Sequence, residues 1–273
     1  MDKLKGDNQI GRFRQIAEKL VSRLSLIEGV VGIVFMGGLA RGFADRFSDV
    51  DIDVYLSVED RKLKQTIREM CADEQKRSGI DVDLSIHFLG EFKKRKWTEI
   101  DRWDYSHALI VYDPKDEVKR LLDQKLQVPR DLWVKRIATC AEYLKWYCCP
   151  PKENVGTMAE AWIERGDLVS AHYCVTYAVD VLLRVIFALN KEFVPPQKWR
   201  IYYSYTLKWL PPNYKELFRE ALITKELSTS DFERRLEVIR KIWYTTVPKI
   251  EEETGLTLGA LSKYYIENVL QQG

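Results

Sequence analysis

Two adjacent glycines and a run of alternating aspartates lie close together in the N-terminal part of the chain. Gly37 and Gly38 come first, and Asp49, Asp51 and Asp53 follow them. Glycine accepts positive φ and lets backbone N–H groups approach a phosphate closely, especially where a helix begins. The aspartates alternate with apolar residues, so their side chains share one face of a strand. The pattern predicts a phosphate-binding turn beside a carboxylate-rich strand.

Carboxylates that share a strand face repel one another, so we expect a cation among them. Ligands that offer only oxygen favour Mg²⁺ or Mn²⁺ over zinc. A second alternating segment, residues 79–88, offers a further carboxylate. We prefer Asp83, inside that segment, to Asp81 at its start. The sequence therefore predicts a magnesium or manganese site made by two neighbouring strands.

These residues resemble the signature of the DNA polymerase β-like nucleotidyltransferases. That signature is an apolar residue, Gly-Gly or Gly-Ser, a spacer of about ten residues, and then Asp-apolar-Asp-apolar. Here Gly37-Gly38 is followed by Ser48 and by the pair Asp49 and Asp51. Many members of the family have serine in place of the second glycine, and glycine is an accepted variant.

The aspartates fit the signature in two registers. Asp49 with Asp51 and Asp51 with Asp53 both match, and side-chain alternation does not separate them because all three acids share a face. We prefer the first register because the family often has Ala-Arg-Gly before Ser-Asp-apolar-Asp, which matches Arg41 and Ser48 with their neighbours.

The resemblance implies the transfer of an NMP unit from ATP or another NTP to an acceptor hydroxyl, with two Mg²⁺ ions between the carboxylates. Asp49, Asp51 and Asp83 are then the catalytic, metal-binding residues. The implied nucleotide-binding residues are Gly37, Gly38, Arg41, Ser48 and Lys198.

The C-terminal part resembles the helical half of small-molecule nucleotidyltransferases, including relatives of the aminoglycoside and lincosamide adenylyltransferases. The similar segments are residues 165–172, 187–190 and 194–199. The resemblance implies that this half closes over the NTP, that Lys198 reaches the triphosphate, and that the acceptor is a small molecule. The candidates for the general base are Glu160, Glu164 and Asp167.

The fold class expected is α+β, with residues 1–114 as a mixed-sheet nucleotidyltransferase domain and residues 115–273 as an all-helical bundle. In the first part, apolar periodicity predicts helices at 9–28, 39–46 and 59–77, and strands at 30–36, 49–55, 79–88 and within 106–114. In the second part it predicts helices at 115–126, 130–148, 155–190, 198–209, 213–225, 229–246 and 258–271. We expect a cleft between the two domains.

Composition indicates a globular protein of the cytoplasm. The chain has 273 residues, 46% of them hydrophobic, with a net charge of +2 and five cysteines. An odd cysteine count that includes an adjacent pair argues for a reducing compartment. The N-terminus has no apolar signal core, and the most apolar segment contains Asp180 and Arg184, which we expect to pair within a buried helix.

Several alternatives for the acceptor and the activity stay open at this stage. A protein side chain or an RNA end is an alternative acceptor to a small molecule, although a near-neutral net charge argues modestly against RNA. Arg165 and His172 loosely match the Arg-spacer-His pattern of HEPN-type ribonucleases.

Overall fold

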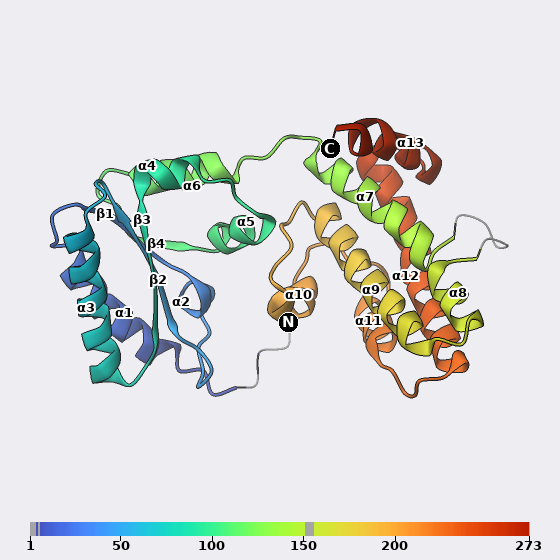
Figure 1. Cartoon of the computed structure of the whole chain (residues 1–273), viewed down its shortest axis with the longest axis horizontal. Helices are drawn as coiled ribbons and strands as arrows, with labels where there is room; N and C mark the ends of the chain where they lie inside the picture. The colour runs from blue at the N-terminus through green and yellow to red at the C-terminus, as the bar shows by residue number, and fades with distance from the viewer. Residues whose placement is uncertain (1–3, 5, 151–155, 273) are drawn as a thin grey trace. The chain divides into compact units, whose positions relative to one another are not determined.

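The computed structural model describes residues 4, 6–150 and 156–272, apart from the side chain of the last residue in that range. The chain divides into two compact units, one ending at Val128 and the other beginning at Pro129 (Figure 1). Each unit has its own hydrophobic core, so we describe them separately.

The N-terminal unit is built on a mixed four-stranded sheet. Its strands are β1 (Val30–Phe35), β2 (Val50–Leu56), β3 (Val82–Phe88) and β4 (Leu109–Tyr112), in the order β3-β2-β1-β4. β2 and β3 are parallel, whereas β1 is antiparallel to both β2 and β4. The structure confirms the predicted α+β fold class and its mixed sheet.

Helices cover both faces of this sheet. The unit contains α1 (Ile10–Leu24), α2 (Gly37–Arg41), α3 (Arg61–Ser78), α4 (Leu89–Lys94), α5 (Glu99–Ser106) and α6 (Glu117–Leu126). The even-numbered residues of β2, such as Ile52, pack against α1 and α3, while Tyr55 on the other face packs against α4, α5 and α6. The acidic residues of β2 therefore lie on the face that carries α4, α5 and α6.

The N-terminal unit extends beyond residue 114, where the sequence placed the boundary between residues 1–114 and residues 115–273. α6 belongs to this unit because its apolar side chains Val118, Leu121 and Leu122 pack against the sheet. Gly32 in β1 admits this helix: a Cβ there would lie 2.3 Å from a methyl carbon of Val118. The helical pattern alone did not reveal this contact.

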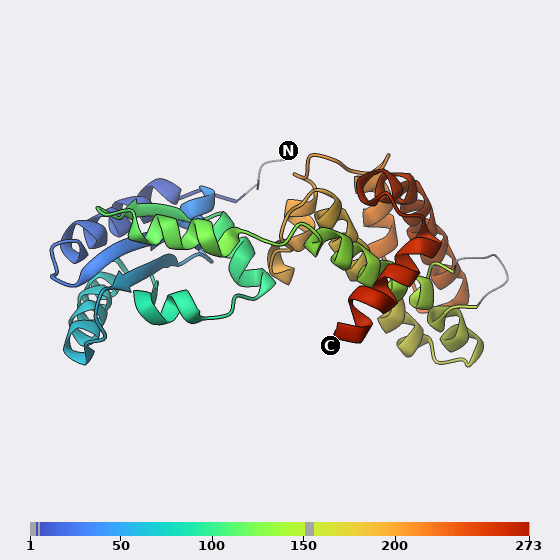
Figure 2. The same cartoon turned by 90° about the horizontal axis from the view of Figure 1, so that it is seen from above.

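The C-terminal unit is entirely helical among its described residues. It contains α7 (Leu132–Tyr147), α8 (Met158–Glu164), α9 (Leu168–Leu189), α10 (Gln197–Ser204), α11 (Tyr214–Leu222), α12 (Thr229–Thr254), α13 (Leu258–Asn268) and a 3₁₀ turn η1 (Leu270–Gln272). α9 lies at its centre and packs beside α7, α8 and α12, and both views show α7 alongside α9 (Figures 1 and 2).

α9 is long and apolar enough to cross a membrane, but 67% of its most apolar window is buried inside the structure, as in the core helix of a soluble protein. The predicted pair is present: Arg184 Nε donates to Asp180 Oδ2 at 2.9 Å.

Three helix predictions for this unit were wrong in extent, and one of them, the helix expected at 198–209, ends at Ser204. Residues 155–190 form two helices rather than one; Gly166 adopts φ 76° between them and the Asp167 side chain accepts from Ser170 N at the start of α9. The first residue of that predicted helix, 155, lies outside the described residues. The helix expected at 229–246 continues through Pro248 to Thr254.

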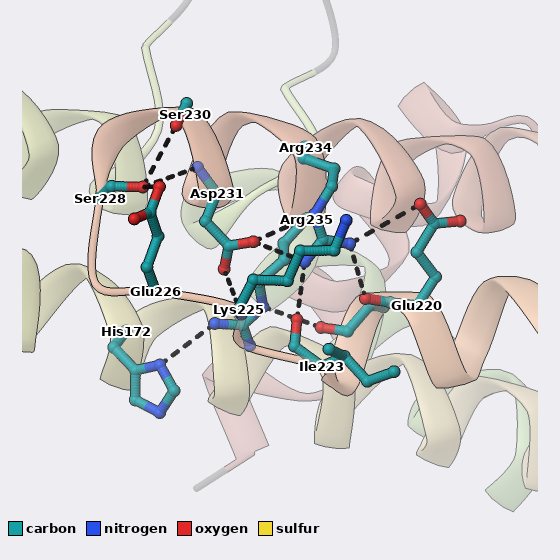
Figure 3. A network of polar contacts seen from close by, with 11 residues as sticks. His172, Glu220, Ile223, Lys225, Glu226, Ser228, Ser230, Asp231, Arg234 and Arg235 are labelled. Carbon is teal, nitrogen blue, oxygen red and sulfur yellow. Dashed lines mark hydrogen bonds and ion pairs between the residues drawn. The ribbon is translucent and has the colours of Figure 1, made fainter.

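A polar network joins α9 to the α11–α12 connection (Figure 3). Arg234 donates to the carbonyl oxygens of Glu220 at 3.0 Å and Ile223 at 2.7 Å, which satisfies acceptors at the end of α11. Arg235, only 1% exposed, donates to His172 Nδ1 at 3.1 Å. The two guanidinium groups therefore hold the connection in place against the helices on either side.

Candidate active site

The glycine turn and β2 approach each other more closely than a side chain would allow. Gly37 adopts φ 50°, and a Cβ on it would lie 1.6 Å from Asp51 Oδ2. The backbone is fixed there by a hydrogen bond from Met36 N to Asp51 O at 3.1 Å. Glycine is required at this position because the carboxylate occupies the space of a side chain.

The second glycine is explained by the loop that follows it. A Cβ on Gly38 would lie 2.5 Å from the backbone oxygen of Phe43. The chain turns back at this point through hydrogen bonds from Gly42 N and Phe43 N to Gly38 O, at 2.9 and 3.2 Å. Because of this tight turn, residue 38 has no room for the serine that many DNA polymerase β-like nucleotidyltransferases have at this position.

Three carboxylates converge beside the turn. One oxygen each from Asp49, Asp51 and Asp83 lies within 4.8 Å of the others. The parallel pairing of β2 with β3 places Asp51 directly opposite Asp83, and Val50 N donates to Asp81 O at 2.9 Å at the start of this pairing. Sheet register thus brings together the acids that the sequence placed on two separate strands.

The electrostatics of this cluster suit a divalent cation. Burial, and then the charges of Asp49 and Asp83, raise the pKa of Asp51 to about 7, against a smaller opposing effect of Arg41. A cation bound by the three carboxylates would remove the part of this rise that the neighbouring charges cause. Three oxygen donors without nitrogen or sulfur match the preference of Mg²⁺ or Mn²⁺. The donor set therefore fits the expected metal.

Asp53 has a different environment from the other two acids of β2. Its side chain accepts hydrogen bonds from the Tyr105 hydroxyl and from His87 Nε2, the latter at 3.1 Å, and the residue is 7% exposed. These bonds hold the carboxylate within the packing between the sheet and α5. The geometry thus favours the register with Asp49 and Asp51 over the one with Asp51 and Asp53.

Asp81 is also held away from the cluster. Its Oδ1 accepts from Gln75 Nε2 at 2.8 Å, and the residue precedes the first residue of β3. Asp83, which lies within β3, is the acid that the structure places beside Asp51.

Arg41 acts at the carboxylate cluster, whereas Ser48 belongs to the turn before β2. The guanidinium carbon of Arg41 is 5.3 Å from the ring centre of Trp103, and its charge acts on Asp51. Ser48 Oγ instead accepts from Asp45 N at 3.0 Å, so its hydroxyl stabilises the turn before β2. The structure therefore places Arg41 at the carboxylate site and gives Ser48 a role in the loop.

The remaining predicted residues lie in the C-terminal unit. Lys198 is exposed on α10, and Glu164 is exposed at the end of α8. Glu160 accepts hydrogen bonds from Thr157 in a capping box and from Arg240 at 2.7 Å. Burial by itself would raise the pKa of Glu160, but these hydrogen bonds outweigh burial and lower the pKa. Asp167 caps α9. Glu160 and Asp167 thus have structural partners within their own unit.

The ribonuclease pattern gains no support from the geometry of His172. Its Nδ1 accepts from Arg235, as Figure 3 shows, so this nitrogen already has a buried donor. Arg165, the other residue of the pattern, has its guanidinium carbon 4.9 Å from the ring centre of Trp162.

The contribution of α5 to the site was not evident from local sequence patterns. Trp103 and Tyr105, both on this helix, contact Arg41 and Asp53. The one available signal was the helix start itself, where Thr98 and Asp101 form a capping box.

Two family models match parts of this chain. Residues 13–110 match a nucleotidyltransferase domain, and residues 104–200 match a domain of unknown function, DUF4037. The first match includes all of the residues of the carboxylate cluster and the glycine turn. A comparison with curated proteins finds no match.

Solved structures with some likeness include a nucleotidyltransferase-like protein from Exiguobacterium sibiricum 255-15. It is 13% identical, with 88% of this chain and 77% of that chain covered and a TM-score of 0.42. Two mutants of the toxin-antitoxin MntA-HpeT are each 16% identical over 48% of this chain and 98% or 97% of theirs, with TM-scores of 0.33 and 0.32.

At TM-scores this low the structural likenesses add nothing to the assignment, which depends on the family match, the motif and the observed mixed sheet. Residues 13–110 of this chain form a nucleotidyltransferase domain, consistent with the DNA polymerase β-like superfamily.

Proposed function

We propose that this protein is a Mg²⁺-dependent nucleotidyltransferase that moves AMP from ATP to a hydroxyl group of a small molecule in the cytoplasm. One observation carries the proposal: Asp49, Asp51 and Asp83 present oxygens within 4.8 Å of one another beside a glycine turn. Three carboxylates this close repel one another, and a bound cation compensates for that cost.

In the proposed reaction the acceptor oxygen forms a bond to the α-phosphorus, and the bond from that phosphorus to the pyrophosphate breaks. The hydroxyl gives its proton to solvent water, and pyrophosphate leaves with the electron pair of the bond that breaks. Mg²⁺, when bound, supplies positive charge to the triphosphate and acidifies the acceptor hydroxyl.

The chain contributes orientation and charge. Asp49, Asp51 and Asp83 would hold the metal, whether Mg²⁺ or Mn²⁺, while the absence of a side chain on Gly37 leaves room for the Asp51 carboxylate. Arg41 adds positive charge next to the carboxylates, where the phosphates would lie.

The small-molecule acceptor is supported by the resemblance of the helical half and by the net charge of +2, which gives no strong field for RNA. To test it, the protein is incubated with Mg²⁺ and ATP labelled at the α-phosphate. Three reactions contain a panel of hydroxyl-bearing small molecules, a bacterial protein extract, or RNA. Label transferred only to small molecules supports the proposal. Label on proteins or RNA would show that the acceptor is a macromolecule instead.

Two variants with the same charge change separate catalysis from general effects. Asp51→Asn should abolish label transfer, because it removes a metal ligand. Asp73→Asn, at an exposed position on α3, should leave it unchanged. Equal turnover by Asp51→Asn and wild type at saturating Mg²⁺ would refute the assignment of the site.

A further inference from the structure

A buried tryptophan faces the arginine of the proposed site. Trp103 on α5 is 2% exposed, and the Arg41 guanidinium carbon lies 5.3 Å from its ring centre. This distance is within the range of a cation–π contact, for which tryptophan is the best partner among the aromatic side chains.

Trp103 stands apart from the hydrophobic cores. Although it is almost fully buried, it is in none of the three hydrophobic clusters formed by the described residues. Its ring centre lies 4.7 Å from that of His107, and its carbonyl oxygen accepts from Ser106 Oγ at 2.8 Å. The indole ring is thus close to both an imidazole and a guanidinium.

The contact with Trp103 acts on an arginine at the end of a short helix. It is the last residue of the short helix α2, directly before Gly42 with φ 81°. An arginine side chain loses considerable rotamer entropy when it is held in one position. Its charge already acts on Asp51, so the contact with the indole holds that charge beside the carboxylates.

We propose that Trp103 is a positioning residue that holds Arg41 ready to bind the triphosphate of the NTP. This inference rests on the proposed function. It also explains why α5 lies at the site, because this helix carries the aromatic surface on which the phosphate-binding guanidinium lies. The family match and the glycine-aspartate motif do not assign this role to α5.

The proposal is tested by the dissociation constant of MgATP, measured by isothermal titration for the full chain and its variants. Trp103→Leu removes the π surface and should weaken binding by roughly three- to thirty-fold, from the usual range of a cation–π contact. Trp103→Phe keeps a smaller ring and should recover part of the loss. Arg41→Ala should weaken binding at least as much as Trp103→Leu.

The double variant distinguishes positioning from a structural role. If Trp103 acts through Arg41, adding Trp103→Leu to Arg41→Ala causes no further loss. Phe13→Leu is the matched control, since it shortens another buried ring, on α1, which packs on the opposite face of the sheet; its dissociation constant should equal that of wild type.

Three results would overturn the inference. The first is binding of MgATP by Trp103→Leu as tight as by wild type, and the second is a double variant in which the losses of the two single variants multiply. Either outcome removes the role of Trp103 and leaves the proposed function standing. The third is failure of wild type to bind any Mg²⁺-NTP, which overturns the proposed function and this inference with it.

Discussion

Replacing Asp51 by asparagine should stabilise the metal-free protein. The increase in its free energy of unfolding should be larger at pH 8 than at pH 5. Burial and the neighbouring Asp49 and Asp83 raise the pKa of Asp51 from 3.8 to about 7. The folded protein therefore binds a proton more tightly at this carboxyl than the unfolded chain does. As a result, stability falls as pH rises from about 4 to about 7 and stays low above that window.

The size of the effect follows from the pKa values. A rise in pKa from 3.8 to about 7 lowers the free energy of unfolding by roughly 4 kcal/mol once Asp51 is ionised in both the folded and the unfolded protein. Between pH 5 and pH 8, linkage gives a change of roughly 2–3 kcal/mol. Asparagine keeps the shape of the side chain and carries no charge, so the variant escapes this loss.

The assay is urea unfolding at pH 5 and pH 8 in the presence of EDTA, with wild type, Asp51→Asn and the control Asp73→Asn. We expect the difference in free energy of unfolding between Asp51→Asn and wild type to increase with pH. The free energy of unfolding of Asp73→Asn should depend on pH in the same way as that of wild type. A difference that is independent of pH, or that shrinks as pH rises, would show that the pKa of Asp51 is not raised in the folded protein.

Three further predictions concern the same unit. Mg²⁺ should raise the melting temperature of wild type and not that of Asp51→Asn; an equal rise in both would place the bound metal elsewhere. Gly37→Ala should abolish NTP binding, because the added Cβ would lie 1.6 Å from the Asp51 carboxylate, whereas Gly42→Ala, with no atom near its added Cβ, should lose some stability and keep binding. Tyr105→Phe should lower the free energy of unfolding by about 1–3 kcal/mol because buried Asp53 loses a donor, and an unchanged urea midpoint would contradict this.

Local patterns in the sequence were sufficient for much of the N-terminal fold. Alternation predicted the strands that became β2 and β3, and the glycine pair marked the turn between β1 and β2. The helix expected at 39–46 was wrong in extent, because α2 spans Gly37–Arg41 and ends at Gly42 with φ 81°. The partner of each acid was not predictable in the same way. Asp49, Asp51 and Asp53 share a face, and only Tyr105 and His87, from other segments, distinguish Asp53 from its neighbours.

One error came from local backbone conformation, and two came from long-range packing. Residues 155–190 have continuous helical periodicity, and the break at Gly166 depends on the left-handed backbone of one residue. α6 looked like part of the helical half because its pattern is helical, and its apolar face packs on the sheet instead. α5 is short, and its contacts with Arg41 and Asp53 join positions far apart in the chain.

The metal–triphosphate site at Asp49, Asp51 and Asp83 is tested most directly by isothermal titration of ATP, GTP, CTP and UTP into wild type and Asp51→Asn, with Mg²⁺ and with EDTA. We predict that at least one NTP, with ATP foremost, binds wild type only with Mg²⁺, and that Asp51→Asn weakens this binding at least about tenfold through the loss of a metal ligand. Binding that is equally tight in EDTA, or unchanged in Asp51→Asn, would contradict a metal–triphosphate site at Asp49, Asp51 and Asp83.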